Sequence, residues 1–208
     1  MSSGGDLPPL DAATTAVVCI EFQNEFTTEG GKLHDAVKAV MASTGMLANA
    51  AATVDAARKK GALILHCPIV FTDDYRELRA DAYGILANVK DGGAFKKTEW
   101  GGEICKEMTP HEGDSVVEGK RGLCGFASTN LDFILRQRGI KTIALCGFLT
   151  NCCVESSMRS GYEKGYRVIT LTDCCAATSQ DAHDAAVAFT FPMFSLPAKH
   201  TEFLAALK

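Results

Sequence analysis

The hydrophobic positions of the chain fall into short apolar runs separated by segments with helical spacing. Runs rich in β-branched residues predict strands at 14–20, 62–66, 115–118, 142–146 and 167–172, with a last short strand near 193–196. Apolar residues at three- and four-residue spacing predict helices over 35–60, 129–138, 152–164 and 180–189, and from 201 onward. The strands are apolar along most of their length, which is typical of a parallel sheet covered on both faces. We therefore expect a three-layer α/β/α fold with a central, mainly parallel sheet of about six strands.

Turn and capping signals set the limits of these elements. A break at 43–45 divides the 35–60 helix in two, and Gly61 ends it. Ser179 is the expected N-cap of the 180–189 helix, and Thr150 or Asn151 that of the helix after the fourth strand. The segment 68–110 has few regular elements, which is typical of an active-site wall or a partner surface.

Composition narrows the class of protein. The 208 residues are 47% hydrophobic and 22% charged, as in a globular chain. The net charge of −4 gives no reason to expect nucleic acid or an anionic membrane as a partner, and no apolar run approaches the length of a membrane span. We expect a loose leader over 1–13 and a single domain over 14–208.

Nine cysteines occur in a chain whose first residues lack the basic and apolar regions of an export signal. We therefore expect reduced thiols and a cytoplasmic location. None of the cysteines has the CxxC spacing of a zinc cluster, so a cysteine-bound metal fits the sequence poorly.

Two cysteines lie in the sequence Gly-Phe-Leu-Thr-Asn-Cys-Cys-Val at 147–154, directly after the fourth strand. In the first turn of a helix, unpaired backbone N–H groups favour a thiolate, which predicts a thiol pKa below the free value of about 8.5. The same groups can bind the oxyanion formed when sulfur attacks a carbonyl. Alternatively, Cys152 and Cys153 are small buried hydrophobic residues, and this turn alone leaves both interpretations open.

Glu21, Lys120 and Cys153 follow the first, third and fourth predicted strands. Because the carboxyl ends of parallel strands share one edge of a sheet, we expect these side chains to lie together. A carboxylate can accept the thiol proton, a lysine can hold both anions in place, and the thiolate can attack a carbonyl carbon. His66 also ends a strand, and we interpret it as structural or pocket-lining.

Together, these segments resemble the isochorismatase-like cysteine hydrolases. The matching pieces are 19–26 (Cys-Ile-Glu-Phe-Gln-Asn-Glu-Phe), Lys120 six residues before Phe126, 147–155, 165–168 and 172–177. The resemblance extends from about Thr14 to Leu207. Each piece is weak alone, but their order and spacing make the match fairly specific.

The resemblance implies roles for individual residues. Cys153 would be the nucleophile, Lys120 the catalytic lysine, and Glu21 would occupy the place of the catalytic acid. The backbone N–H groups of Leu149 and Cys153 would form the oxyanion hole, with a cis peptide bond between Phe148 and Leu149. Relatives in this family are commonly dimers or tetramers, so we expect a homodimer or homotetramer.

The sequence departs from the family pattern in two ways. Glu21 and Glu25 stand where the family has aspartates, and the extra methylene displaces a carboxylate by more than an ångström unless the backbone compensates. The Asp-x-His-x-x-x-x-His segment that binds metal in nicotinamidases is absent after the second strand. The resemblance therefore favours an active enzyme with an altered acid and without a metal or other cofactor.

We expect a metal-independent hydrolase that cleaves the C–N bond of a small amide, ureido or carbamoyl compound through a thioester. Two alternatives stay open: isochorismatase-type cleavage of a vinyl ether, and a catalytically impaired binding or scaffold protein marked by Glu21. The partner in the leading hypothesis is a small-molecule substrate. From their positions in the chain, the expected pocket residues are Phe22, Trp100, Leu123, Cys124 and Phe126.

Overall fold

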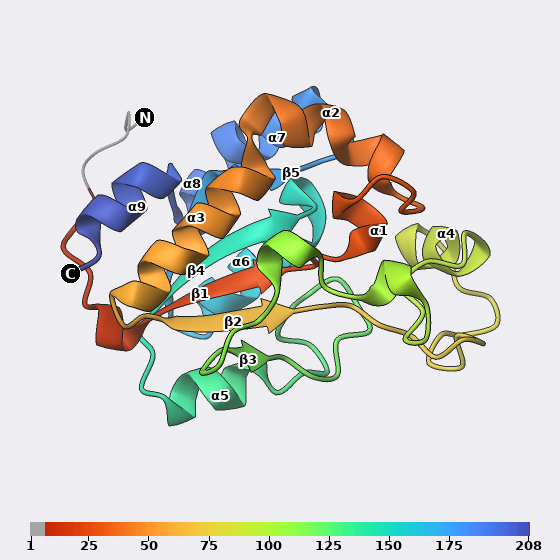
Figure 1. The fold of residues 1–208 in the computed structure, drawn as a ribbon, viewed down its shortest axis with the longest axis horizontal. Coiled ribbons are helices and arrows are strands. Elements are labelled where there is room, and N and C mark those ends of the chain that lie inside the picture. Colours follow the sequence, from red (N-terminus) through yellow and green to blue (C-terminus); the bar gives the residue numbers. More distant parts are fainter. Residues whose placement is uncertain (1–6) are drawn as a thin grey trace.

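A single sheet of six strands forms the centre of the computed structural model, which describes residues 7–208 (Figure 1). The strands are β1 (Thr15–Ile20), β2 (Leu63–Cys67), β3 (Ser115–Val116), β4 (Thr142–Phe148), β5 (Arg167–Ala176) and β6 (Leu196–Ala198). They lie in the order β3-β2-β1-β4-β5-β6, and every neighbouring pair is parallel. The predicted parallel sheet of about six strands is confirmed.

Helices cover both faces of this sheet. They are α1 (Asn24–Thr27), α2 (His34–Thr44), α3 (Met46–Lys59), α4 (Ile85–Asp91), α5 (Leu131–Gln137), α6 (Glu155–Glu163), α7 (Gln180–Ala185), α8 (Phe191–Phe194) and α9 (His200–Ala206). In Figure 1, α3 and α9 lie in front of the sheet and α6 lies behind it. The predicted three-layer α/β/α arrangement is therefore confirmed.

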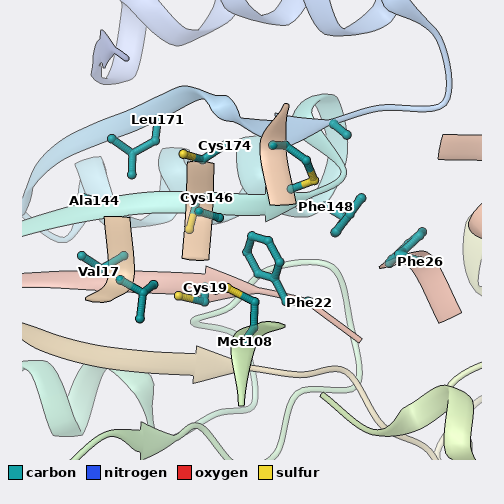
Figure 2. Packing of buried hydrophobic residues seen from close by; sticks show 14 of the residues in the cluster. Val17, Cys19, Phe22, Phe26, Met108, Ala144, Cys146, Phe148, Leu171 and Cys174 are labelled. Atoms are coloured by element: carbon teal, nitrogen blue, oxygen red, sulfur yellow. The ribbon is translucent and has the colours of Figure 1, made fainter. Parts of the chain in front are cut away.

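Successive side chains of a strand point to opposite faces, and both faces are buried here. In β1, Val17 and Cys19 belong to the core beneath α2, α3 and α9, whereas Val18 belongs to the core beneath α5, α6 and α8. Figure 2 shows the first core, with Ala144 and Cys146 of β4 beside the β1 side chains. This double burial explains the nearly continuous apolar runs in the sequence.

Several helix limits follow the sequence signals. Gly45, with a φ of 67°, separates α2 from α3, and the side chain of Ser179 accepts a hydrogen bond from the Ala182 N–H at the start of α7. The expectation that Thr150 or Asn151 caps the helix after β4 is wrong. Leu149 precedes a π-helical turn, Thr150–Val154, without a side-chain cap.

The last strand lies later in the chain than predicted. It spans Leu196–Ala198, and Met193 and Phe194 of the expected strand belong to α8. Pro192 is the second residue of α8, which directly follows the π-helical turn Ala186–Thr190. The apolar run alone did not distinguish a short helix from a strand.

The expected leader covers 1–13, of which residues 1–6 lie outside the described part of the chain. The Leu10 N–H donates to the Ala206 carbonyl at 2.9 Å, and the Ala12 N–H donates to the Lys208 carbonyl at 2.9 Å. Leu10 is buried. From Leu10 onward, this segment is therefore attached to the C-terminal end of the chain rather than loose.

Within residues 7–208, no helix combines the length and apolar character that crossing a membrane requires.

Replacing Gly147 by alanine is expected to destabilise the fold strongly. Gly147 has a φ of +124°, and a Cβ there would lie 1.9 Å from the carbonyl oxygen of Ile20 in the neighbouring strand β1. That oxygen belongs to the backbone of a central strand, so the free energy of unfolding should fall by more than about 4 kcal/mol. Urea unfolding followed by circular dichroism measures the loss.

Gly165 provides the matched control, because its φ of +88° is also positive but a Cβ there meets no atom within 4 Å. Gly165→Ala should cost only about 1–2 kcal/mol, the strain of the left-handed backbone. Equal losses in the two variants would contradict the clash with Ile20.

Candidate active site

The three residues expected to converge lie at the carboxyl edge of the sheet. Glu21 directly follows β1, Cys153 lies in the π-helical turn after β4, and Lys120 lies in the loop after β3. β1 and β4 are neighbours at the point where the strand order reverses. In open α/β sheets, this switch point is where ligands bind.

Lys120 and Glu21 form a buried ion pair. The Nζ of Lys120 donates to the Oε1 of Glu21 and to the Gly122 carbonyl at 2.6 Å. Lys120 is 0% exposed and Glu21 2% exposed. Burial lowers the pKa of Lys120, but the charges of Glu21 and Cys153 outweigh it, and the net pKa is raised. The lysine is therefore held in its charged form.

Cys153 lies beside this pair, and its thiol does not have the low pKa that the turn sequence predicts. The neighbouring Cys152 thiol, burial and the Glu21 carboxylate raise the pKa of Cys153 well above its ordinary value, and only Lys120 acts in the opposite direction. The prediction of a lowered thiol pKa is therefore wrong for Cys153, which is 3% exposed, whereas the Cys153 thiol lowers the pKa of Cys152 in the same turn. At rest, Cys153 is a protonated thiol.

The backbone at Glu21 lies in the left-handed region, with a φ of 58°. A residue with a Cβ pays about 1–2 kcal/mol for this conformation. The Glu21 N–H donates to the Cys67 carbonyl at 3.2 Å, and the Glu21 carbonyl accepts from the Gln23 N–H at 2.7 Å. These bonds fix the backbone of Glu21, and Lys120 holds its carboxylate.

The peptide bond between Phe148 and Leu149 is cis. Within residues 7–208, the Leu149 N–H donates to no backbone carbonyl, whereas the Leu149 carbonyl accepts from the N–H groups of Cys152 and Val154 at 3.0 and 3.2 Å. The turn therefore presents the unpaired Leu149 amide three residues before Cys152.

Glu25 is buried and is not part of the Lys120–Glu21 ion pair. Its carboxylate accepts the Lys32 N–H at 2.7 Å and the Phe95 N–H at 3.2 Å. A Cβ on Gly101 would lie 2.4 Å from this carboxylate, which explains the glycine there. Glu25 thus attaches the irregular segment after β2 to α1.

A cavity of about 200 Å³ opens beside Glu21 and Cys153. Its walls come from α1, α2, α4, the segment after β2 and the turn after β4. The lining residues are Glu21, Phe26, Leu33, Ala36, Val37, Ile69, Ile85, Leu86, Asn88, Val89, Phe95, Leu123, Leu149, Cys153 and Thr178. The segment 68–110 therefore provides part of the site wall, one of its two expected roles.

Of the expected pocket residues, Leu123 lines this cavity. Phe22 instead packs edge-on against Phe148 with ring centroids 5.7 Å apart (Figure 2), and Phe126 stacks on Tyr166.

The other two expected pocket residues also lie elsewhere. Trp100 is 48% exposed, and the Cys124 Sγ donates to the Ser160 Oγ at 3.2 Å. Nearness in sequence to Glu21 and Lys120 was a poor guide for Phe22, Cys124 and Phe126, which lie in irregular segments after the strands.

Sequence reasoning missed the walls contributed by α2 and α4. Leu33, Ala36 and Val37 share one face of the α2 segment, at helical spacing that the sequence does show. The sequence does not show which face turns toward the cavity, because that depends on how α4 folds over it. Thr178, after β5, was also not anticipated.

An isochorismatase domain model matches residues 15–202 of the chain. The chain belongs to the isochorismatase family. Ureidoacrylate amidohydrolase RutB of Agrobacterium fabrum is 31% identical over 196 residues, which cover 89% of this chain and 86% of that relative. The resemblance stated from the sequence motifs is confirmed.

Solved structures agree with this assignment. A cysteine hydrolase from Pseudomonas syringae pv. phaseolicola 1448A superposes with a TM-score of 0.86 at 24% identity, covering 99% of this chain and 98% of that one. N-carbamoylsarcosine amidase from Thermoplasma acidophilum superposes with a TM-score of 0.70 at 26% identity, covering 90% and 96%. The isochorismatase fold therefore accounts for nearly the whole chain.

Two histidines of this isochorismatase family member support elements around the site. The Nδ1 of His183 in α7 lies 2.8 Å from the Thr150 Oγ1, so the hydroxyl expected as a cap contacts a neighbouring helix instead. The Nε2 of His66 lies 3.3 Å from the Asp114 Oδ2, and His66 does not line the cavity. Burial lowers the pKa of both histidines, so both are neutral at physiological pH.

One group of potential metal ligands was found in the described chain, away from the cavity. It comprises Asp173, Cys174 and His200, whose ligand atoms lie within 4.8 Å of one another. The Asp173 carboxylate accepts the His200 N–H at 2.8 Å and lies 2.7 Å from the His200 Nδ1. These contacts already join β5 to α9.

Glu21→Gln is expected to lower the pKa of the Cys153 thiol. The carboxylate raises this pKa and Lys120 lowers it, so removing the negative charge leaves the lysine to stabilise the thiolate. Iodoacetamide labelling of Cys153, followed by peptide mapping across pH 6–10, should show a midpoint at lower pH and severalfold faster labelling near pH 8.

Glu155→Gln is the matched control, because Glu155 begins α6 close to the cysteines but pairs with Arg159 at 3.0 Å. Its labelling profile at Cys153 should follow the wild type. A Glu21→Gln midpoint that stays in place or moves to higher pH would show that this carboxylate does not control the thiol.

Proposed function

We propose that this protein is a metal-independent cysteine hydrolase that cleaves the C–N bond of a small amide, ureido or carbamoyl compound. One observation carries the proposal: the buried Lys120–Glu21 pair and the Cys153 thiol meet at the edge of one small cavity. The geometry supplies an acid–base group, a fixed cation and a nucleophile at one point.

The first half of the reaction forms a thioester. Glu21 accepts the proton of the Cys153 thiol, sulfur attacks the carbonyl carbon, and the carbonyl electron pair moves to oxygen. The N–H groups of Leu149 and Cys153 stabilise the oxyanion. When the C–N bond breaks, the proton on Glu21 moves to the leaving nitrogen, and the amine departs.

The second half regenerates the enzyme. Glu21 removes a proton from water, which attacks the thioester carbon, and the C–S bond breaks to release the acid and the Cys153 thiol. Lys120 pairs with Glu21 at rest and stabilises the thiolate once Glu21 has accepted the proton. No step draws on a metal, because backbone amides and Lys120 supply all the positive charge.

Two kinds of observation support this reaction over the alternatives. The relatives include enzymes named ureidoacrylate amidohydrolase and N-carbamoylsarcosine amidase, whose names describe C–N cleavage. The site also keeps a charged lysine, an acid and a thiol together, although the acid is glutamate. A scaffold protein has no need to maintain a buried ion pair of this kind.

We further propose that residues 14–208 form one catalytic domain in a cytoplasmic protein. All nine cysteines are free in the described chain, which suits a reducing compartment. A homodimer or homotetramer is supported by exposed apolar side chains on α6 and the nearby 189–196 segment. Tyr162 is 53%, Phe189 75% and Met193 66% exposed.

Cys153→Ser is expected to abolish amide hydrolysis, with a loss of roughly 1,000-fold or more, because no other group can form the thioester. Cys152→Ser should retain activity, since Cys152 does not line the cavity. Ammonia release from primary amides, ureido acids and N-carbamoyl compounds measures turnover, and intact-protein mass spectrometry detects the acyl-enzyme. Amide hydrolysis that survives in Cys153→Ser would contradict a thioester at this cysteine.

Glu21→Asp restores the family's usual acid but should lower kcat/KM by roughly 100-fold, because the shorter side chain moves the carboxylate away from Lys120 and Cys153. Glu21→Gln, which cannot accept a proton, should lose more. Higher activity in Glu21→Asp would contradict a site built around glutamate.

A further inference from the structure

The cavity beside Cys153 has an apolar lining. Apolar side chains from α2 and α4 face it, including Leu33, Val37, Leu86 and Val89. Among the described residues that line it, Glu21 is the one charged side chain, and Lys120 already pairs with it. Asn88 and Thr178 are the uncharged polar residues of the lining, so a substrate group that enters this cavity meets mostly hydrocarbon and, at the reacting end, an anion.

The arginines nearest in sequence to Lys120 and Cys153 form ion pairs outside the cavity. Arg121 pairs with Glu77 at 3.0 Å and donates to the Lys120 carbonyl at 3.1 Å. Arg159 pairs with Glu155 at 3.0 Å. Neither arginine lines the cavity, so neither is placed to bind a substrate carboxylate there.

The volume of the cavity limits the size of the substrate group that can enter it. A dry cavity of about 150 Å³ lined by aliphatic and aromatic side chains holds benzene. At about 200 Å³, this cavity has room for a phenyl ring or a branched alkyl chain of similar size. A carboxylate in the same place would lose its hydration without gaining a cationic partner.

We propose that the carbonyl group cleaved by this enzyme carries an uncharged, apolar substituent, which fills the cavity between α2 and α4. This inference rests on the proposed hydrolysis at Cys153 and names the substrate class of that site. Neutral aryl or branched alkyl amides fit the cavity, and amides with a carboxylate on the acyl side do not.

Protection of Cys153 from alkylation tests the cavity without requiring turnover. The full chain is treated with limiting iodoacetamide at pH 9, with benzamide, isovaleramide or succinamate present, and labelling of Cys153 is followed by peptide mapping. Benzamide and isovaleramide should halve the labelling rate at concentrations at least tenfold lower than succinamate. Hydrolysis of the same three amides is measured separately by ammonia release.

Two variants of one helix sharpen the test. Ala36 lines the cavity and Ala39 does not, and both are exposed on α2, so arginine is tolerated by the helix at either position. Ala36→Arg should weaken protection by benzamide and strengthen protection by succinamate, each severalfold. Ala39→Arg should behave as the wild type.

The outcomes separate the two proposals. Succinamate that protects as well as benzamide, or no protection by either neutral amide, overturns the apolar substrate class. Protection by benzamide without hydrolysis of any amide supports the apolar cavity and contradicts the proposed hydrolase. Preferential protection by the neutral amides together with their faster hydrolysis supports both.

Discussion

The arrangement of the site depends on the buried ion pair between Lys120 and Glu21. An ammonium group that is fully removed from water is tolerated only when it is paired and hydrogen-bonded, and here Glu21 and the Gly122 carbonyl meet that need. The pair joins the loop after β3 to the end of β1 across the intervening strand β2. Breaking it by removing one partner typically costs about 3–5 kcal/mol, so the same contact serves both stability and chemistry.

The ion pair also determines the state of the nucleophile. A thiol at a helix start is expected to ionise easily, yet the Cys152 thiol, burial and the Glu21 carboxylate hold the pKa of Cys153 high. The negative charge at rest therefore lies on Glu21, where Lys120 balances it, and moves to sulfur only when the proton is transferred. In this arrangement, attack on the carbonyl and proton transfer belong to one step, and the reactive thiolate is not exposed between turnovers.

The sequence predicted those features that follow from the parallel sheet itself. Continuous apolar strands imply burial on both faces, and parallel strands bring Glu21 and Cys153 to one edge. It did not predict the pocket wall, because the contribution of α2 depends on how the irregular segment folds over Ala36 and Val37. Phe126 shows the same limit: its position near Lys120 suggested the pocket, but its side chain packs on Tyr166 in the core.

Water in the apolar cavity affects the strength of the electrostatic interactions beside it. Electrostatic interactions weaken in a hydrated site, and a substituent that fills the hydrocarbon walls displaces that water from beside Glu21 and Cys153. The attraction between Lys120 and the thiolate then strengthens at the stage when negative charge moves from Glu21 to sulfur. A small polar amide does not displace the water from the cavity. Its transition state therefore lacks the stronger attraction between Lys120 and the thiolate. Such an amide should therefore have a lower kcat as well as a higher KM, because the binding energy of the remote substituent helps to stabilise the transition state.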